Sequence, residues 1–148
     1  VFGDNGAGKT TLIKLICGLY EDYRGKILLQ NNERHSYEKD EIRNLYSYAM
    51  QDGPHYPFTV KEKEKFIFDE PTSALDPLAE QEFINTLLSW YKNKTVVIIS
   101  HRMTFASIAD RVFVIKDGAF AEQGTPKQLL NAKGLFYEYF NTQRSLYF

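Results

Sequence analysis

The sequence predicts an α/β domain with a mostly parallel sheet flanked by helices. Three observations carry this prediction. Short apolar runs alternate with segments of helical periodicity along the chain. A glycine-rich turn, GDNGAGKT, follows a strand-like start and precedes a helical run. An apolar run at 65–69 ends on two adjacent carboxylates, Asp69 and Glu70, as buried strands of such sheets do when they lead into a site.

The first half of the chain supplies one helix and two strands. Apolar residues at helical spacing run from 12 to 16, and Gly18 is expected to end that helix. Residues 25–30 are predicted to form a short strand, and 31–41 a polar loop with room for one helical turn. Residues 45–51 alternate and are rich in β-formers, which predicts a second strand.

The second half alternates in the same way. Asp76 followed by Pro77 predicts a helix start, with an N-cap side chain and a first-turn proline. The apolar face expected for that helix comprises Phe83, Ile84, Leu87, Leu88 and Tyr91. The remaining expected elements are a turn at 52–57, strands at 65–69 and 95–100, helices at 102–110, 125–130 and 134–143, and a hairpin at 111–124 turning at Asp117 and Gly118.

Length and composition exclude several classes of protein. The 148 residues suit one domain, and 43% apolar with 25% charged residues is ordinary for a folded protein. A net charge of −1 gives no basic surplus, so no nucleic-acid partner is expected. Apolar runs such as 96–99 are too short to span a bilayer. The lone Cys17 excludes an internal disulfide and is expected to be inert core packing.

The glycine-rich turn carries the clearest chemistry. It fits the phosphate-loop pattern of two fixed glycines, a lysine and a hydroxyl. Glycines let successive backbone N–H groups point at phosphate oxygens, and the following helix presents its positive end to the same anion. Lys9 is expected to reach the β- and γ-phosphates. The predicted nucleotide-binding residues are Gly3, Asp4, Asn5, Gly6, Ala7, Gly8, Lys9, Thr10 and Thr11.

The carboxylate pair needs a positive partner, because two like charges at a strand end repel and are costly to desolvate. In a phosphate-loop NTPase core, a neighbouring strand delivers an acid to the magnesium shell. Asp69 is predicted to fill that role together with the Thr10 hydroxyl, and Glu70 to be the general base for an attacking water. The prediction is that Lys9 and this pair share one cleft around a magnesium-bound triphosphate.

Four motifs in order, GDNGAGKTT, MQD, FIFDEPTSALD and ISHR, resemble the ATP-binding cassette domain of ABC transporters over nearly the whole chain. The resemblance implies ATP and Mg²⁺ as cofactors. It implies that Gln51 contacts the metal and the attacking water, that 73–76 cross to a partner domain, and that His101 faces the γ-phosphate. His35 and His55, in polar loops, are expected to be ordinary. The ending from 116 to 143 resembles exporter cassettes, which implies a place at the cytoplasmic face of the cell membrane.

The sequence also departs from the family pattern. No LSGGQ-like motif occurs, and residues 52–65 are a short connector where the family has a helical subdomain. The leading strand is reduced to Val1 and Phe2, with no upstream aromatic residue for the adenine, so the chain is interpreted as a fragment. Residues 1–148 are therefore interpreted as a single partial, truncated ABC ATP-binding domain. Val1 and Phe2 are not expected to pair with the neighbouring strands, and the exposed sheet amides predict an unstable or aggregating chain.

Family cassettes work as head-to-tail pairs, so the resemblance implies a second nucleotide-binding domain and a transmembrane domain as partners. Without its own LSGGQ motif the isolated chain is predicted to have negligible ATPase turnover. Two alternatives stay open. One is a non-catalytic remnant that binds nucleotide or a partner cassette. The other is a soluble ABC protein of translation or DNA repair, which the balanced charge disfavours.

Overall fold

The structure is a computed structural model that describes residues 1–49 and 64–147. Backbone contacts divide the chain into two compact units: Val1–Lys9 with Ile98–Phe148, and Thr10–Val97. Helix α1 (Lys9–Ile16) therefore has its first residue, Lys9, in the first unit and all its other residues in the second unit. As predicted, α1 is followed by Gly18 in a left-handed conformation, with φ of +74°.

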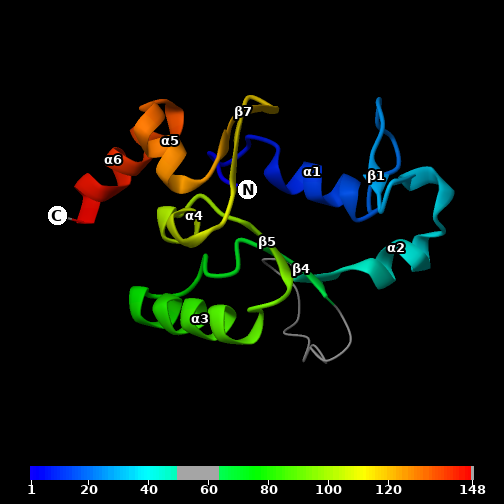
Figure 1. The fold of residues 1–148 in the computed structure, drawn as a ribbon, viewed down its shortest axis with the longest axis horizontal. Coiled ribbons are helices and arrows are strands. Elements are labelled where there is room, and N and C mark those ends of the chain that lie inside the picture. Colours follow the sequence, from blue (N-terminus) through cyan, green and yellow to red (C-terminus); the bar gives the residue numbers. More distant parts are fainter. Residues whose placement is uncertain (50–63, 148) are drawn as a thin grey trace. The chain divides into compact units, whose positions relative to one another are not determined.

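The first unit is built on a two-stranded antiparallel sheet with three helices (Figure 1). Strands β6 (Val112–Lys116) and β7 (Ala119–Gly124) form the predicted hairpin. Asp117 and Gly118 turn it with φ of +51° and +76°, both positive, as a type I′ turn requires. The helices are α4 (Met103–Ile108), α5 (Pro126–Ala132) and α6 (Leu135–Tyr147). The buried core of the unit consists of Phe2, Met103, Ala106, Val112, Val114, Leu129 and Phe136.

The short N-terminal segment pairs on both sides, so the expectation that two residues cannot pair is wrong. Phe2 forms parallel bridges to Ser100 and to Val114. Its N–H donates to the Phe113 carbonyl and its carbonyl accepts from Ile115, both at 2.8 Å. The Phe2 side chain is 3% exposed, because it is one of the apolar core residues of this unit. Hydrophobic burial thus holds in place a strand too short to be recognised from its length.

The second unit contains the strands that lead to the acid pair. Strands β3 (Ser47–Ala49), β4 (Lys65–Asp69) and β5 (Thr95–Ile99) lie in the order β3-β4-β5, and the last two residues of β5 belong to the first unit. Strands β3 and β4 are parallel, with Tyr48 opposite Ile67. The predicted α/β class with a parallel sheet is confirmed. The predicted turn at 52–57, residues 52–63 of the predicted 52–65 connector and the end of the 45–51 strand lie outside the described residues.

The polar segment predicted as a loop is more ordered than expected. Strands β1 (Leu28–Leu29) and β2 (Asn32–Glu33) form a small hairpin, followed by a 3₁₀ turn at Arg34–Ser36 and helix α2 (Lys39–Leu45). The prediction of a loop with at most one helical turn is wrong for α2. Glu38 and Glu41 form a reciprocal capping box at the start of this helix. The usual N-cap residue of such a box is Ser or Thr, so a glutamate at that position does not predict a helix start.

Helix α3 (Pro77–Trp90) begins where predicted. The Asp76 carboxylate accepts from the amides of Leu78 and Ala79, both at 2.9 Å. The helix packs on β4, with the Phe83 and Phe68 rings meeting edge to face at 6.0 Å. Leu88 does not belong to the buried face: it is 51% exposed, unlike Ile84 and Leu87.

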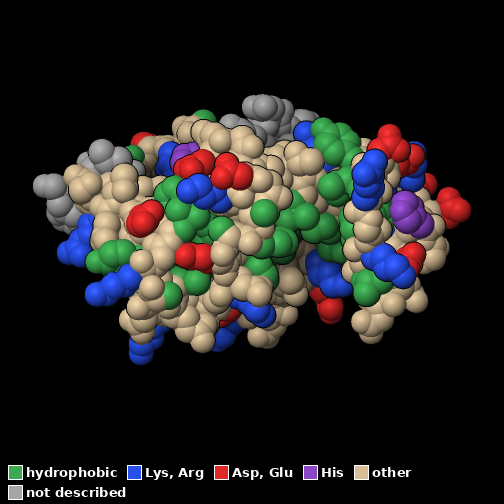
Figure 2. Space-filling view, turned by 90° about the horizontal axis from the view of Figure 1, so that it is seen from above, with side chains coloured by type: hydrophobic (Ala, Val, Ile, Leu, Met, Phe, Trp, Pro, Cys, Tyr) green, Lys and Arg blue, Asp and Glu red, His purple; other side chains and the backbone are tan. Residues whose placement is uncertain are grey.

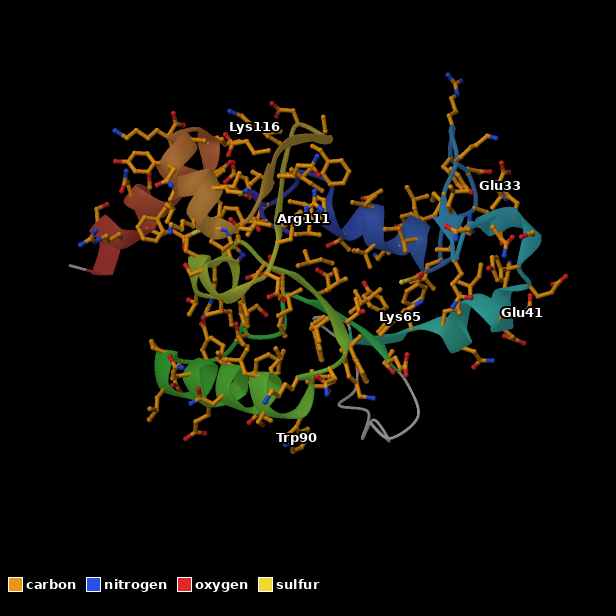
Figure 3. All side chains as sticks on the ribbon, viewed as in Figure 1. Glu33, Glu41, Lys65, Trp90, Arg111 and Lys116 are labelled. Atoms are coloured by element: carbon orange, nitrogen blue, oxygen red, sulfur yellow. The ribbon has the colours of Figure 1, made fainter. Side chains whose placement is uncertain are left out.

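Trp90, at the C-terminal end of α3, points away from the strands and is 63% exposed (Figure 3). Basic and acidic side chains are interspersed on the surface that Figure 2 shows, in line with the net charge of −1. No helix within the described ranges combines the length and the apolar character needed to cross a bilayer.

Candidate functional site

The glycine-rich turn has the backbone that its sequence predicts. Gly3, Gly6 and Gly8 have φ of +152°, +81° and +98°, in regions that other residues rarely adopt. Gly3 is also pressed against β6, since a Cβ built there would lie 2.3 Å from the Ile115 carbonyl oxygen. The turn therefore needs glycine for its conformation at three positions and for close packing at one of them.

The Lys9 ammonium group lies within the curve of this turn. Its Nζ donates to the carbonyl oxygens of Gly3 and Asp4, at 2.8 Å each, and the residue is only 5% exposed. A buried ammonium group is costly unless several acceptors surround it. The loop supplies such acceptors and places a positive charge beside its own curled backbone, which is the arrangement that binding of a phosphate group requires.

The next residue after Lys9 begins the second half of the site. The Thr10 hydroxyl donates to the Asp69 carboxylate with an Oγ1–Oδ1 distance of 3.2 Å. Asp69 closes β4 and is 5% exposed. Thr10 and Asp69 are 59 positions apart in the sequence, and the structure brings their oxygens together.

Tyr48 is a further partner of Asp69 that sequence reasoning missed. Its hydroxyl donates to the second carboxylate oxygen, with an O–O distance of 3.2 Å. Tyr48 is opposite Ile67, and Asp69 is two residues further along the same face of β4. Desolvation, with the charge and hydrogen bond of Asp69 in support, raises the pKa of Tyr48 above its ordinary value, so the hydroxyl remains a donor. A tyrosine in the middle of the predicted 45–51 strand was the available signal.

Glu70 is held in a strained conformation. Its φ is +48°, the left-handed region that non-glycine residues enter at a cost of about 1–3 kcal/mol. Its carbonyl accepts from Ser73 at 3.2 Å, which starts the turn after the acid pair. Such strain is common at functional sites, where a side chain must be aimed in one direction. The following residues 73–76 are exposed.

His101 lies two residues after the end of β5 and is half-buried. Its backbone is fixed from α6: the Gln143 side chain donates to the His101 carbonyl at 2.6 Å and accepts from the Met103 amide at 2.9 Å. The Ser100 hydroxyl accepts from the Arg102 amide at 3.0 Å. The short connection between β5 and α4 is therefore held at the His101 carbonyl and at the Arg102 and Met103 amides.

The remaining site predictions have different outcomes. Gln51 and His55 lie outside the described residues. Asp4, Asn5 and Gly6 are exposed along the turn, Ala7 is buried, and Thr11 is exposed on α1. Lys9 belongs to the first unit and Asp69 and Glu70 to the second, so their shared cleft stays a prediction.

The donor set fits a magnesium-bound nucleotide. Within the described ranges no group of three or more His, Cys, Asp or Glu could enclose a metal ion. Mg²⁺ does not need such a cage, because it keeps several waters and takes one or two protein oxygens together with phosphate oxygens. The Thr10 hydroxyl and the Asp69 carboxylate are hard oxygen ligands 3.2 Å apart.

Comparison with known proteins identifies the family. The profile of the family described as ABC transporter matches residues 1–114. The chain belongs to the ABC transporter family. The matched region of this family member includes the glycine turn, the acid pair and His101.

Several curated members of the ABC transporter family are similar to the chain. The subtilin transport ATP-binding protein SpaT of Bacillus subtilis is 28% identical over 92% of this chain and 33% of its own length. The mitochondrial iron-sulfur clusters transporter ATM1 of Kluyveromyces lactis is 26% identical over 99% of this chain and 29% of its own. The pediocin PA-1 transport/processing protein PedD of Pediococcus acidilactici is 41% identical over 53% of this chain.

A solved structure shows the same fold. A bacterial Atm1-family ABC exporter with ATP bound superposes with a TM-score of 0.84 at 21% identity. The match covers 96% of this family member and 36% of that chain. The chain thus spans about a third of the length of the first two curated relatives and of this structure.

Proposed function

We propose that the chain is an ATP-binding and ATP-hydrolysing domain that powers transport of a substrate across a membrane as part of an ABC exporter. The single observation that carries the proposal is the 3.2 Å distance between the Thr10 hydroxyl and the Asp69 carboxylate, with Lys9, the residue before Thr10, buried in the glycine turn. A hydroxyl, a carboxylate and an ammonium group from these two motifs are the set that phosphoryl-transfer sites use.

Each residue has a distinct role in this proposal. Backbone amides of the turn at 3–11 and the Lys9 ammonium group hold the phosphates. Thr10, Asp69 and Gln51 hold Mg²⁺, which neutralises phosphate charge when bound. Glu70 accepts a proton from the attacking water, and its strained backbone, with φ of +48°, supports a fixed orientation for that role. His101 contacts the γ-phosphate.

The proposal includes a partial domain. The alignment with SpaT extends over 203 residues although the chain has 148, so that relative has residues within the aligned span with no counterpart here. This supports the interpretation of 1–148 as a cassette in which 52–65 replace a helical subdomain. The chain then completes a site only with a second nucleotide-binding domain, works with a transmembrane domain at the cytoplasmic face of the membrane, and has negligible turnover alone.

Equilibrium binding of MgATP to the purified chain tests the nucleotide site. Lys9→Met is expected to weaken binding by about 100-fold, because a charge-assisted contact in a buried position is lost. Asp69→Asn is expected to weaken binding in Mg²⁺ but to leave binding in excess EDTA unchanged. Lys127→Met, at an exposed position of α5, is the matched control for removal of a lysine side chain elsewhere in the chain. Equal affinity of the unmodified chain and Lys9→Met would reject the proposal.

Turnover separates the hydrolysing domain from a non-catalytic remnant. The chain is mixed with an intact ABC cassette whose own catalytic glutamate has been replaced, and phosphate release is measured. The proposal predicts release that depends on both partners and disappears in Glu70→Gln. Binding of MgATP without any release in the mixture would favour the remnant.

A further inference from the structure

Helix α6 presents three side chains on one face toward the core and the loops of the first unit. Phe136, Tyr139 and Gln143 are spaced three and four residues apart, so they lie along one side of the helix. Phe136 is 0% exposed and belongs to the apolar core, where its ring meets that of Phe2 edge to face at 6.0 Å. This contact anchors the helix and fixes where the other two side chains lie.

The Gln143 side-chain amide donates one hydrogen bond to, and accepts another from, the backbone around His101. Its Nε2 donates to the His101 carbonyl at 2.6 Å, and its Oε1 accepts from the Met103 amide at 2.9 Å. Met103 is the first residue of α4, whose N–H has no acceptor within that helix. Two oppositely directed bonds to neighbouring backbone groups fix both the position and the orientation of the connection.

Tyr139 reaches the glycine turn one helical turn earlier. Its hydroxyl donates to the Asp4 carboxylate at 2.5 Å, and its ring packs on Phe2 at 5.4 Å. The carbonyl of the same Asp4 accepts from Lys9 at 2.8 Å and from the Ala7 amide at 3.2 Å. Tyr139 therefore holds Asp4, whose carbonyl oxygen accepts a hydrogen bond from the Lys9 ammonium group. Burial and the bond to Asp4 raise the pKa of Tyr139 to about 12, so it stays a donor near neutral pH.

We propose that α6 is a positioning element of the nucleotide site, in which Tyr139 holds the glycine turn and Gln143 holds the His101 connection. This inference rests on the proposed function. One rigid helix then sets the spacing between the loop that binds the phosphates and the histidine that contacts the γ-phosphate. Both residues act through others, and neither is assigned a contact with the nucleotide.

Affinities for MgATP and MgADP, measured separately, test this role. Gln143→Leu removes both bonds at similar size, and we expect about five- to tenfold weaker MgATP binding with MgADP binding changed less than about twofold. The difference arises because only ATP has the γ-phosphate that His101 contacts. Tyr139→Phe keeps the ring and removes the hydroxyl, and it is expected to weaken both nucleotides to a similar extent.

Two variants on the same helix are matched controls. Thr142→Val removes a hydroxyl that bonds to the Glu138 carbonyl of α6 itself, and Tyr137→Phe removes a second tyrosine hydroxyl. Both are expected to leave the affinities unchanged. If Gln143→Leu fails to fold, Gln143→Glu replaces it, because a carboxylate still accepts from Met103 but cannot donate to His101.

Hydrogen exchange of the Met103 amide reports on the connection without nucleotide. Faster exchange in Gln143→Leu together with a lower ratio of ATP to ADP affinity supports the inference. Faster exchange with an unchanged ratio overturns it, because the bonds would then serve stability alone. Failure of the unmodified chain to bind MgATP, with Lys9→Met no different, would reject the proposed function and this inference together, and that pattern is distinct from an unchanged ratio.

Discussion

Replacing Gly3 by alanine is expected to disrupt the start of the glycine turn. The new Cβ would lie 2.3 Å from the Ile115 carbonyl oxygen, where contacts under 3.0 Å essentially never occur. The obstacle is backbone of β6, so no side chain can rotate away. Ile115 also donates to the Phe2 carbonyl at 2.8 Å, and a shift of β6 away from Gly3 would stretch this bond. The perturbation therefore acts on the pairing of the N-terminal segment as well as on the turn.

The magnitude follows from two contributions. Alanine at φ of +152° carries backbone strain of about 1–3 kcal/mol. Forcing a methyl group against fixed atoms adds about 1–3 kcal/mol, as overpacking does elsewhere. We expect Gly3→Ala to lower the free energy of unfolding by about 2–6 kcal/mol, a large part of the 5–15 kcal/mol available to an ordinary domain.

Urea denaturation measures this loss, with Gly118→Ala as the control. Gly118 lies in the same unit and also has a positive φ, +76°, but a Cβ there would meet nothing within 4 Å. The control carries strain of about 1–3 kcal/mol without overpacking. An equal loss of stability in the two variants would refute the reasoning, because the contact with Ile115 would then have no energetic effect.

Three further predictions concern stability and reactivity. The Glu122 carboxylate accepts from the first two amides of α6 at 2.7 and 2.9 Å, so Glu122→Ala should lower the free energy of unfolding by about 1.5–3 kcal/mol in urea melts. No change would mean that α6 is held by its apolar face alone. Asp76→Ala should cost about 1 kcal/mol by the same measurement and Asp76→Asn much less, and equal losses would contradict capping as the cause. Burial raises the pKa of the Cys17 thiol from 9.0 to about 11, so less thiolate is present at pH 8, and a thiol reagent should react about 100-fold more slowly with the folded chain than with the urea-unfolded chain. Similar rates would contradict the burial of this thiol.

Much of the site is readable from the sequence because its geometry is local. A turn that needs positive φ at 3, 6 and 8 can hardly be made by residues other than glycine. The hairpin turn at Asp117 and Gly118 and the cap at Asp76 follow the same logic. The acid pair was found because an apolar strand that ends on two carboxylates needs a functional reason.

Other features depend on contacts between distant segments. The role of Tyr48 depends on the parallel register of β3 and β4, which places its hydroxyl near Asp69. The N-terminal segment is too short for its length to predict strand pairing, yet Phe2 pairs on both sides because its side chain is buried in the core. Helix α2 was missed because a glutamate takes the place of the usual capping residue.

The glycine turn, the acid pair, the hairpin and most helix starts can be read from the order of the residues, because each depends on a few neighbours in the chain. Which side chains support these features depends on how distant segments pack together. Tyr139 and Gln143 lie 135 and 42 positions from the residues that they hold, and nothing in their local pattern separates them from other polar groups on an aromatic helix. Their role depends on packing of α6 against the core, which brings together groups that sequence spacing leaves unrelated.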